Sequence, residues 1–139
     1  MTKRILVPMD DSEMAQHALE HALNFFPNAG ITVLHVVGTP SSMLGGATGF
    51  ALEEDLEGAA DEAAEPTLEL ARDIAAEYDH EISTQVQVGH PVRAILNAAE
   101  DFDAIVIGSH SGGLADRLFV GNVTEKIVRQ SPIPVTVTR

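Results

Sequence analysis

The sequence contains no cysteine and few aromatic residues, and both scarcities narrow the possible classes of protein. Without cysteine among its 139 residues, the chain can form no disulfide framework and no thiolate metal site. Aromatic residues make up 4% of the chain and all hydrophobic residues 45%, so the core should consist of valine, isoleucine, leucine and alanine. No apolar run approaches the roughly 18 residues that a membrane-spanning helix needs.

Basic residues are also scarce. Eight lysines and arginines stand against 21 aspartates and glutamates, which gives a formal net charge of −13. Such a surface repels nucleic acid and anionic membranes, so we expect neither as a partner. Only Lys3 and Lys126 are lysines. An acidic excess with little lysine favours a protein adapted to molar salt, where the screening length falls to about 3 Å, over an ordinary acidic protein.

The chain is expected to form one cytoplasmic domain over residues 1–139. This length suffices for one core, and no linker or internal repeat divides it. The first residues lead directly into an apolar strand pattern, without the apolar stretch and cleavage site of a signal peptide.

Apolar periodicity predicts alternating strands and helices. Ser12 is a candidate cap for the first helix, and Pro66 is expected to begin a new helical segment or to kink the helix before it. Strands are predicted at residues 5–9, 31–37, 82–88, 104–108 and 134–138, and helices at 12 to about 27, 51–79, 91–100 and within 122–130. This order predicts an α/β fold, a five-stranded parallel doubly wound sheet flanked by helices.

Two strand ends carry residues suited to binding a nucleotide. Asp10 follows the first strand, and a glycine-rich loop begins at Gly108 after the fourth. Ligands of doubly wound sheets bind beyond the carboxyl ends of the strands, where the strand order reverses. If these two strands are neighbours, a purine-sized cleft with an acidic acceptor and a phosphate-binding loop results.

Four segments carry a resemblance to a known family: I-L-V-P-M-D-D-S-E, T-V-L-H-V-V, I-V-I-G-S-H and G-N-V-T-E-K-I-V-R-Q-S-P-I-P-V-T-V. In this order they closely resemble the universal stress protein family over essentially the whole chain. The resemblance implies a Rossmann-like sheet of strand order 3-2-1-4-5 and a homodimeric regulatory or protective module. It also implies that the protein binds ATP, and Mg²⁺ as a possible cofactor that accompanies the nucleotide. In this resemblance Asp10 and the backbone of Val36 hold the adenine.

The phosphate loop of the family departs here from its usual pattern, G-x-x-G-(nine residues)-G-[S/T]. Gly108 and Gly121 match the first and last glycines, whereas Ser111 and Asn122 replace the middle glycine and the hydroxyl residue. A side chain at a left-handed position costs about 1–2 kcal/mol, although Gly112 can take over the turn. Asn122 can donate its amide to a phosphate or offer its carbonyl oxygen to Mg²⁺.

Because family members that lack this loop do not bind ATP, an alternative is a dimeric interaction module that binds no nucleotide. The predicted nucleotide-binding set is Pro8, Asp10, Val36, Gly108, Ser109, His110, Ser111, Gly112, Gly121, Asn122, Val123 and Thr124. For three of them an alternative without a nucleotide contact stays open. Asp10 can instead serve as a helix cap, although Asp11 is better placed for that role. Gly108 can instead form a close-packing turn, and His110 can instead lie in solvent.

Efficient catalysis is not expected. The sequence offers no nucleophile with an adjacent base and no lysine in the phosphate loop, so any ATP hydrolysis should be slow, with Asp10 or His110 as helpers. His17 and His21 are expected to be surface residues rather than metal ligands, and His35 a satisfied core histidine.

The last predicted strand is a candidate dimer interface. A terminal edge strand offers unpaired N–H and C=O groups, and two such strands can pair antiparallel in a closed two-fold contact. The residues predicted for this contact are Pro134, Val135, Thr136 and Val137.

Overall fold

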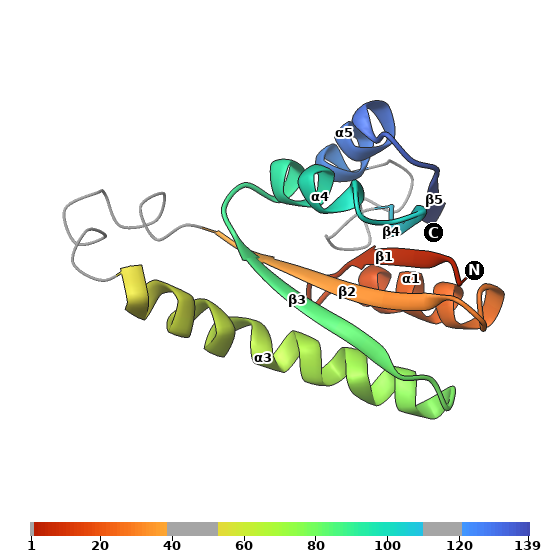
Figure 1. Ribbon diagram of the computed structural model, residues 1–139, viewed down its shortest axis with the longest axis horizontal. Coiled ribbons are helices and arrows are strands. Elements are labelled where there is room, and N and C mark those ends of the chain that lie inside the picture. Colours follow the sequence, from red (N-terminus) through yellow and green to blue (C-terminus); the bar gives the residue numbers. More distant parts are fainter. Residues whose placement is uncertain (1, 39–52, 110–120) are drawn as a thin grey trace.

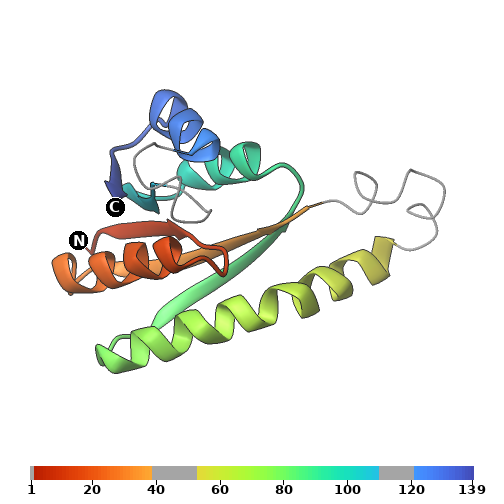
Figure 2. The ribbon, with the colours of Figure 1, turned by 180° about the vertical axis from the view of Figure 1, so that it is seen from behind.

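Five parallel strands form one sheet with two helices against each face (Figures 1 and 2). The computed structural model describes residues 2–38, 53–109 and 121–139. The strands are β1 (Arg4–Pro8), β2 (Gly30–Val37), β3 (Ile82–Val88), β4 (Ala104–Gly108) and β5 (Val135–Thr138), and the helices are α1 (Glu13–Phe25), α3 (Glu53–Glu77), α4 (Pro91–Ala99) and α5 (Asn122–Gln130). The predicted α/β fold is confirmed.

The strand order is β3-β2-β1-β4-β5, so β2 and β3 lie on one side of β1 and β4 and β5 on its other side. The switch point of the sheet, where the strand order reverses, therefore lies between β1 and β4. From β1 the chain builds outward to β2 and β3, and it then crosses over to β4 and β5. Ile5 lies opposite Ala104 and Leu6 opposite Ile105 in the parallel register of β1 and β4. The carboxyl ends of β1 and β4 therefore lie side by side at the same edge of the sheet. A site shared by Asp10 and the loop that begins at Gly108 requires this arrangement.

The sheet separates two hydrophobic clusters. The side chains of Val7 and Val106 belong to the cluster under α1 and α3, whereas those of Leu6 and Ile105 belong to the cluster under α4 and α5. Alternate residues of the central strands thus enter opposite cores, which explains why these strands are apolar throughout. In Figure 1, α4 and α5 lie above the central strands and α3 lies below β3, whereas α1 overlaps β2; Figure 2 shows α1 in front of β2 when the sheet is seen from behind.

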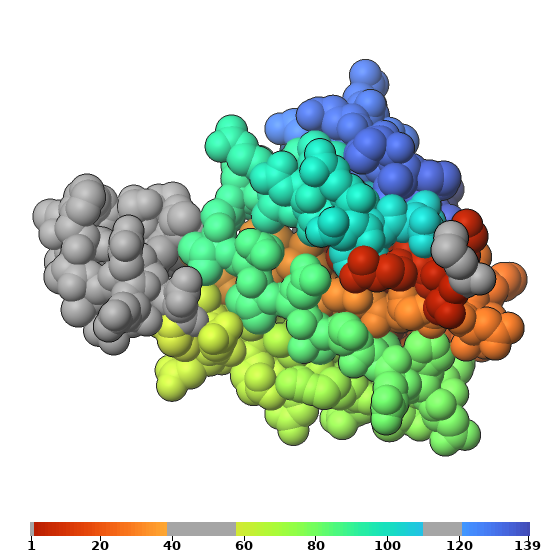
Figure 3. All heavy atoms as spheres, in the orientation of Figure 1, coloured from red at the N-terminus to blue at the C-terminus, as the bar shows by residue number. Residues whose placement is uncertain are grey.

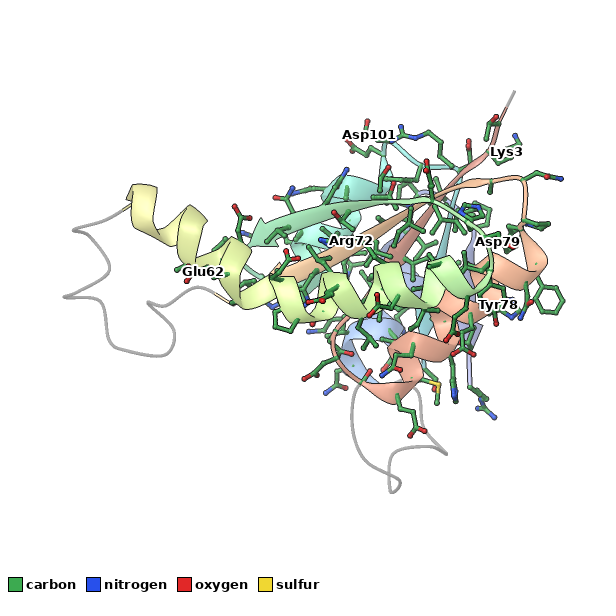
Figure 4. All side chains as sticks on the ribbon, turned by 90° about the horizontal axis from the view of Figure 1, so that it is seen from below. Lys3, Glu62, Arg72, Tyr78, Asp79 and Asp101 are labelled. Atoms are coloured by element: carbon green, nitrogen blue, oxygen red, sulfur yellow. The ribbon has the colours of Figure 1, made fainter. Side chains whose placement is uncertain are left out.

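α3 is one helix that runs through Pro66, so Pro66 does not begin a new helical segment, and the other alternative for this residue, a kink, stays a prediction. Proline removes one backbone hydrogen bond from a helix interior. Here the next two residues, Thr67 and Leu68, are each 5% exposed, and their packing holds the helix together. Figure 4 looks onto α3, with Glu62 and Arg72 along it and Tyr78 and Asp79 at its C-terminal end.

β3 and β5 are the two edge strands. β3 is only partly buried, as its alternating sequence predicted, and its residues lie on the visible face between α3 and α4 (Figure 3). β5 begins at Val135 rather than at the predicted Pro134, whose carbonyl still accepts a hydrogen bond from the Ile105 N–H at 2.9 Å.

Candidate functional site

The connection from β1 to α1 places a carboxylate at the switch point. Oδ1 of Asp10 accepts a hydrogen bond from the Ser12 N–H at 2.9 Å, and Oγ of Ser12 accepts one from the Ala15 N–H at 3.2 Å. Asp10 is half-buried, and a carboxylate has a second oxygen that can accept from a ligand. Ser12 is the N-cap of α1, as predicted. The carboxylate that accepts from the N–H of this cap residue belongs to Asp10 and not to the exposed Asp11, so the expectation that Asp11 fits the cap role better than Asp10 was wrong.

The connection from β4 to α5 places a helix N-terminus near the same edge. The Ser109 N–H donates to the carbonyl of Thr138 at 2.8 Å, and the Gly121 N–H donates to the carbonyl of Ser109. Gly121 is the N-cap of α5, and within the described residues no side chain caps this helix. The first N–H groups of a helix have no partner inside the helix, and together with the helix dipole they attract anions.

Gly108 allows α1 to lie directly on β4. A Cβ atom built on Gly108 would lie 2.8 Å from Cγ of Met14, a distance that real Cβ atoms essentially never show, and 3.0 Å from the Met14 carbonyl oxygen, which is tighter than most real Cβ contacts. The close-packing interpretation of Gly108 is therefore confirmed. The same contact places the start of α1, and with it Asp10, near the end of β4. The predicted contact of Gly108 with phosphate stays a prediction.

Two hydroxyl groups near Gly108 differ in what they can offer a ligand. Thr124 is 4% exposed, and its hydroxyl donates to the carbonyl of Gly108 at 2.7 Å, so its only proton already ties α5 to β4. Ser109 is 1% exposed, and its hydroxyl has no hydrogen-bond partner among the described residues. A buried hydroxyl without a partner is unfavourable, which makes Ser109 a better candidate donor than Thr124.

The remaining predicted site residues fall into three groups. Pro8 is buried at the end of β1 and Val36 is half-buried near the end of β2. Asn122 and Val123 are exposed in the first turn of α5. The predicted contacts of His110, Ser111 and Gly112 lie outside the described residues.

Sequence reasoning missed the role of Met14, because no local pattern shows which residue of a helix will cover a glycine on a distant strand. It predicted a satisfied core histidine at His35, which is hydrogen-bonded but only half-buried, and it did not identify the partner. That partner is the carbonyl of Met9, whose oxygen lies 2.8 Å from Nδ1 of the ring. His35 and Met9 come from the ends of adjacent strands, and only the fold brings them together.

Two other possible functions find no support in the part of the chain that the structure describes. Residues 2–38, 53–109 and 121–139 contain no group of three or more histidine or acidic residues arranged to hold a metal ion. Of the two candidate histidines on α1, His21 stacks on the ring of Phe25, with centroids 4.3 Å apart. None of the described helices is long and apolar enough to cross a membrane.

Known proteins are similar to this chain in sequence and fold. Residues 1–139 match the universal stress protein family. Universal stress protein MJ0577 from Methanocaldococcus jannaschii is 29% identical over 155 aligned positions, which cover 100% of this chain and 96% of that protein. Its solved structure superposes with a TM-score of 0.75 at 28% identity, covering 99% of this chain and 96% of the other.

Two further structures extend the comparison. Universal stress protein UspA from Lactobacillus plantarum has a TM-score of 0.76 and 27% identity, covering 99% of this chain and 97% of its own. A universal stress protein solved in complex with cAMP shares the fold with a TM-score of 0.71 and 21% identity, covering 99% and 97% of the two chains. The chain belongs to the universal stress protein family.

Proposed function

We propose that this universal stress protein family member binds an adenine nucleotide, ATP above all, at the ends of β1, β2 and β4. The observation that carries the proposal is the pairing of β1 with β4. This pairing brings the half-buried carboxylate of Asp10 to the same edge of the sheet as the N-terminus of α5, which no side chain of the described residues caps. A hydrogen-bond acceptor and an anion site at a switch point match the two ends of a nucleotide.

The base would lie between β1 and β2. The adenine amino group is a donor, and the second carboxylate oxygen of Asp10 can accept from it. The peptide groups of Val36 at the end of β2 can supply further backbone contacts. The relative solved with cAMP is a family member whose ligand contains the same base.

The phosphates would lie at the start of α5. The N–H groups of Asn122 and Val123 belong to its first turn, and the buried hydroxyl of Ser109 can add a donor beside Gly121. Mg²⁺ usually binds through substrate phosphates and one or two protein oxygens rather than through an all-protein cage. The side-chain carbonyl of Asn122 suits that role for an ion that arrives with ATP.

Binding rather than turnover is the proposed activity, since the sequence offers no nucleophile with an adjacent base and the loop contains no lysine. Nucleotide occupancy would then serve as the signal of a regulatory or protective module. The second candidate is an interaction module that binds no nucleotide, and the replacement of the family's loop residues by Ser111 and Asn122 favours it.

One pair of substitutions separates these two candidates. If the site binds ATP, the double variant Ser111→Gly/Asn122→Ser should bind it modestly more tightly, by about threefold, because glycine adopts a left-handed turn without steric cost and a hydroxyl ligand is gained. The measurement is a calorimetric titration with Mg²⁺-ATP in molar KCl. Binding by the double variant alone would show that the natural chain has lost the site and would support the interaction module.

We also propose a homodimer that forms through β5. The N–H of Ile105 bonds to the carbonyl of Pro134, and the N–H of Ser109 to that of Thr138, so even-numbered residues of β5 direct their backbone groups to β4. By alternation, the backbone groups of Val135 and Val137 point to the free edge. This is the edge that a second copy of the chain can extend antiparallel.

The substitution Val137→Pro should shift the protein from dimer to monomer. Proline removes an N–H from the free edge without removing a bond to β4. The matched control is Val88→Pro on the opposite edge strand: the bond from the Gly89 N–H to the Val37 carbonyl places the backbone groups of Val88 on the free side of β3. Light scattering during size exclusion should show a monomer for Val137→Pro and a dimer for Val88→Pro. A dimer that survives Val137→Pro would exclude this interface.

A further inference from the structure

The imidazole of His35 holds the peptide that precedes the candidate adenine-binding carboxylate. Nδ1 of His35 lies 2.8 Å from the carbonyl oxygen of Met9. A carbonyl oxygen only accepts hydrogen bonds, so Nδ1 must be the nitrogen that carries hydrogen. In the neutral ring this leaves Nε2 without one, which fixes a single tautomer.

This contact lies where β1 leaves the sheet. The N–H of Met9 donates to the carbonyl of Leu34 at 2.8 Å, so the backbone groups of Leu34, and by alternation those of Val36, point toward β1. In a continued parallel ladder, the next bond would join the N–H of Val36 to the carbonyl of Met9. The His35 ring contacts this carbonyl, and β1 ends at Pro8, one residue earlier than the sequence predicted.

The Met9–Asp10 unit is therefore held at both ends. The His35 ring contacts the carbonyl of Met9, and the Ser12 N–H contacts Oδ1 of Asp10 at 2.9 Å. Met9 is 4% exposed, so the held peptide is anchored in the core. The orientation of the Asp10 carboxylate depends on this peptide because the two groups are separated by few rotatable bonds.

We propose that His35 is a positioning residue of the adenine site. Its Nδ1–H holds the Met9 carbonyl, which fixes the direction of the Asp10 carboxylate and leaves the Val36 N–H facing the base. His35 acts through Met9 and does not touch the nucleotide. This inference rests on the proposed nucleotide site, whereas the contact of His35 with Met9 can be tested without any ligand.

The first test is the tautomer of His35 in the ligand-free protein. A long-range ¹H–¹⁵N correlation spectrum distinguishes a protonated from an unprotonated ring nitrogen, and the His35 signals are those lost in His35→Leu. The proposal predicts hydrogen on Nδ1 and none on Nε2 in the neutral ring. Hydrogen on Nε2 alone would overturn it, whatever the protein binds.

The second test compares ATP with tripolyphosphate, which lacks the base. His35→Leu should weaken Mg²⁺-ATP binding about tenfold, the effect of one lost hydrogen bond, and leave tripolyphosphate binding within twofold of the natural protein. His35→Asn, whose amide can replace the Nδ1 donor, should restore most of the loss. His17→Leu, which removes an exposed histidine from α1, should change neither affinity.

The outcomes distinguish this inference from the proposed function. Equal losses for ATP and tripolyphosphate would assign His35 a general structural role and overturn the inference, as would unchanged ATP binding by a folded His35→Leu. A natural protein that binds tripolyphosphate but not ATP would overturn the adenine site itself, and the ligand part of this inference with it.

Discussion

Asp10→Asn is expected to weaken Mg²⁺-ATP binding by about tenfold to a hundredfold, the effect of a lost hydrogen bond to a charged group. The asparagine oxygen can still accept from the Ser12 N–H, as Oδ1 of Asp10 does at 2.9 Å, so the turn into α1 is retained. The amide nitrogen then replaces the second carboxylate oxygen and presents a donor to the adenine amino group. Calorimetric titration in molar KCl measures the change.

The neighbouring residue supplies the matched control for this prediction. Asp11→Asn removes the same charge from an exposed side chain and should leave ATP affinity within twofold. Because guanine carries a carbonyl where adenine carries its amino group, Asp10→Asn should also improve GTP binding relative to ATP. Equal losses of ATP affinity in Asp10→Asn and Asp11→Asn would mean that only the net charge affects binding and that Asp10 does not contact the base.

Gly108→Ala should lower the free energy of unfolding by about 1–3 kcal/mol, the usual cost of overpacking a close contact. The new methyl group would lie 2.8 Å from Cγ of Met14 and 3.0 Å from its carbonyl oxygen, so the first turn of α1 must move away from β4. Because this displacement also moves Asp10, ATP affinity should fall together with stability. Denaturant unfolding measures the first effect and titration the second.

Gly30→Ala is the control for this substitution, because it adds the same methyl group to a strand glycine with room for it. The nearest atom to that methyl group is the Lys3 carbonyl oxygen at 3.9 Å, an ordinary contact distance. Its stability should change by less than about 0.5 kcal/mol, the usual range for surface substitutions. A Gly108→Ala protein as stable as Gly30→Ala would show that α1 does not press against β4 as described.

The sequence predicted the fold well because each element carries a strong local pattern. The apolar residues of β1 and β4 identified buried parallel strands, and Ser12 correctly marked the start of α1. The resemblance to the universal stress protein family supplied the strand order, which periodicity alone does not determine. Pro66 does not begin a new helical segment, because tertiary packing of α3 outweighs one lost backbone hydrogen bond.

The candidate site was harder to predict because its details depend on contacts between distant residues. The sequence could not show that Gly108 packs against Met14, a residue of a distant helix, and its contact with phosphate stays a prediction. Nor could it show that the Thr124 hydroxyl donates to the Gly108 carbonyl, which leaves the predicted nucleotide contact of Thr124 untested. The contact of His35 with Met9 joins residues 26 positions apart, and it depends on the alignment of two strand ends.

Adenine nucleotide binding at the edge shared by Asp10 and the start of α5 is tested by the nucleotide content of the purified protein. The protein is purified in molar KCl and denatured, and the nucleotides in the supernatant are identified by chromatography, with Gly121→Val treated in parallel. We expect nearly one adenine nucleotide for each natural chain and little for Gly121→Val, whose side chain would crowd the N-terminus of α5. A natural protein that releases no nucleotide and takes up no added Mg²⁺-ATP would contradict this expectation.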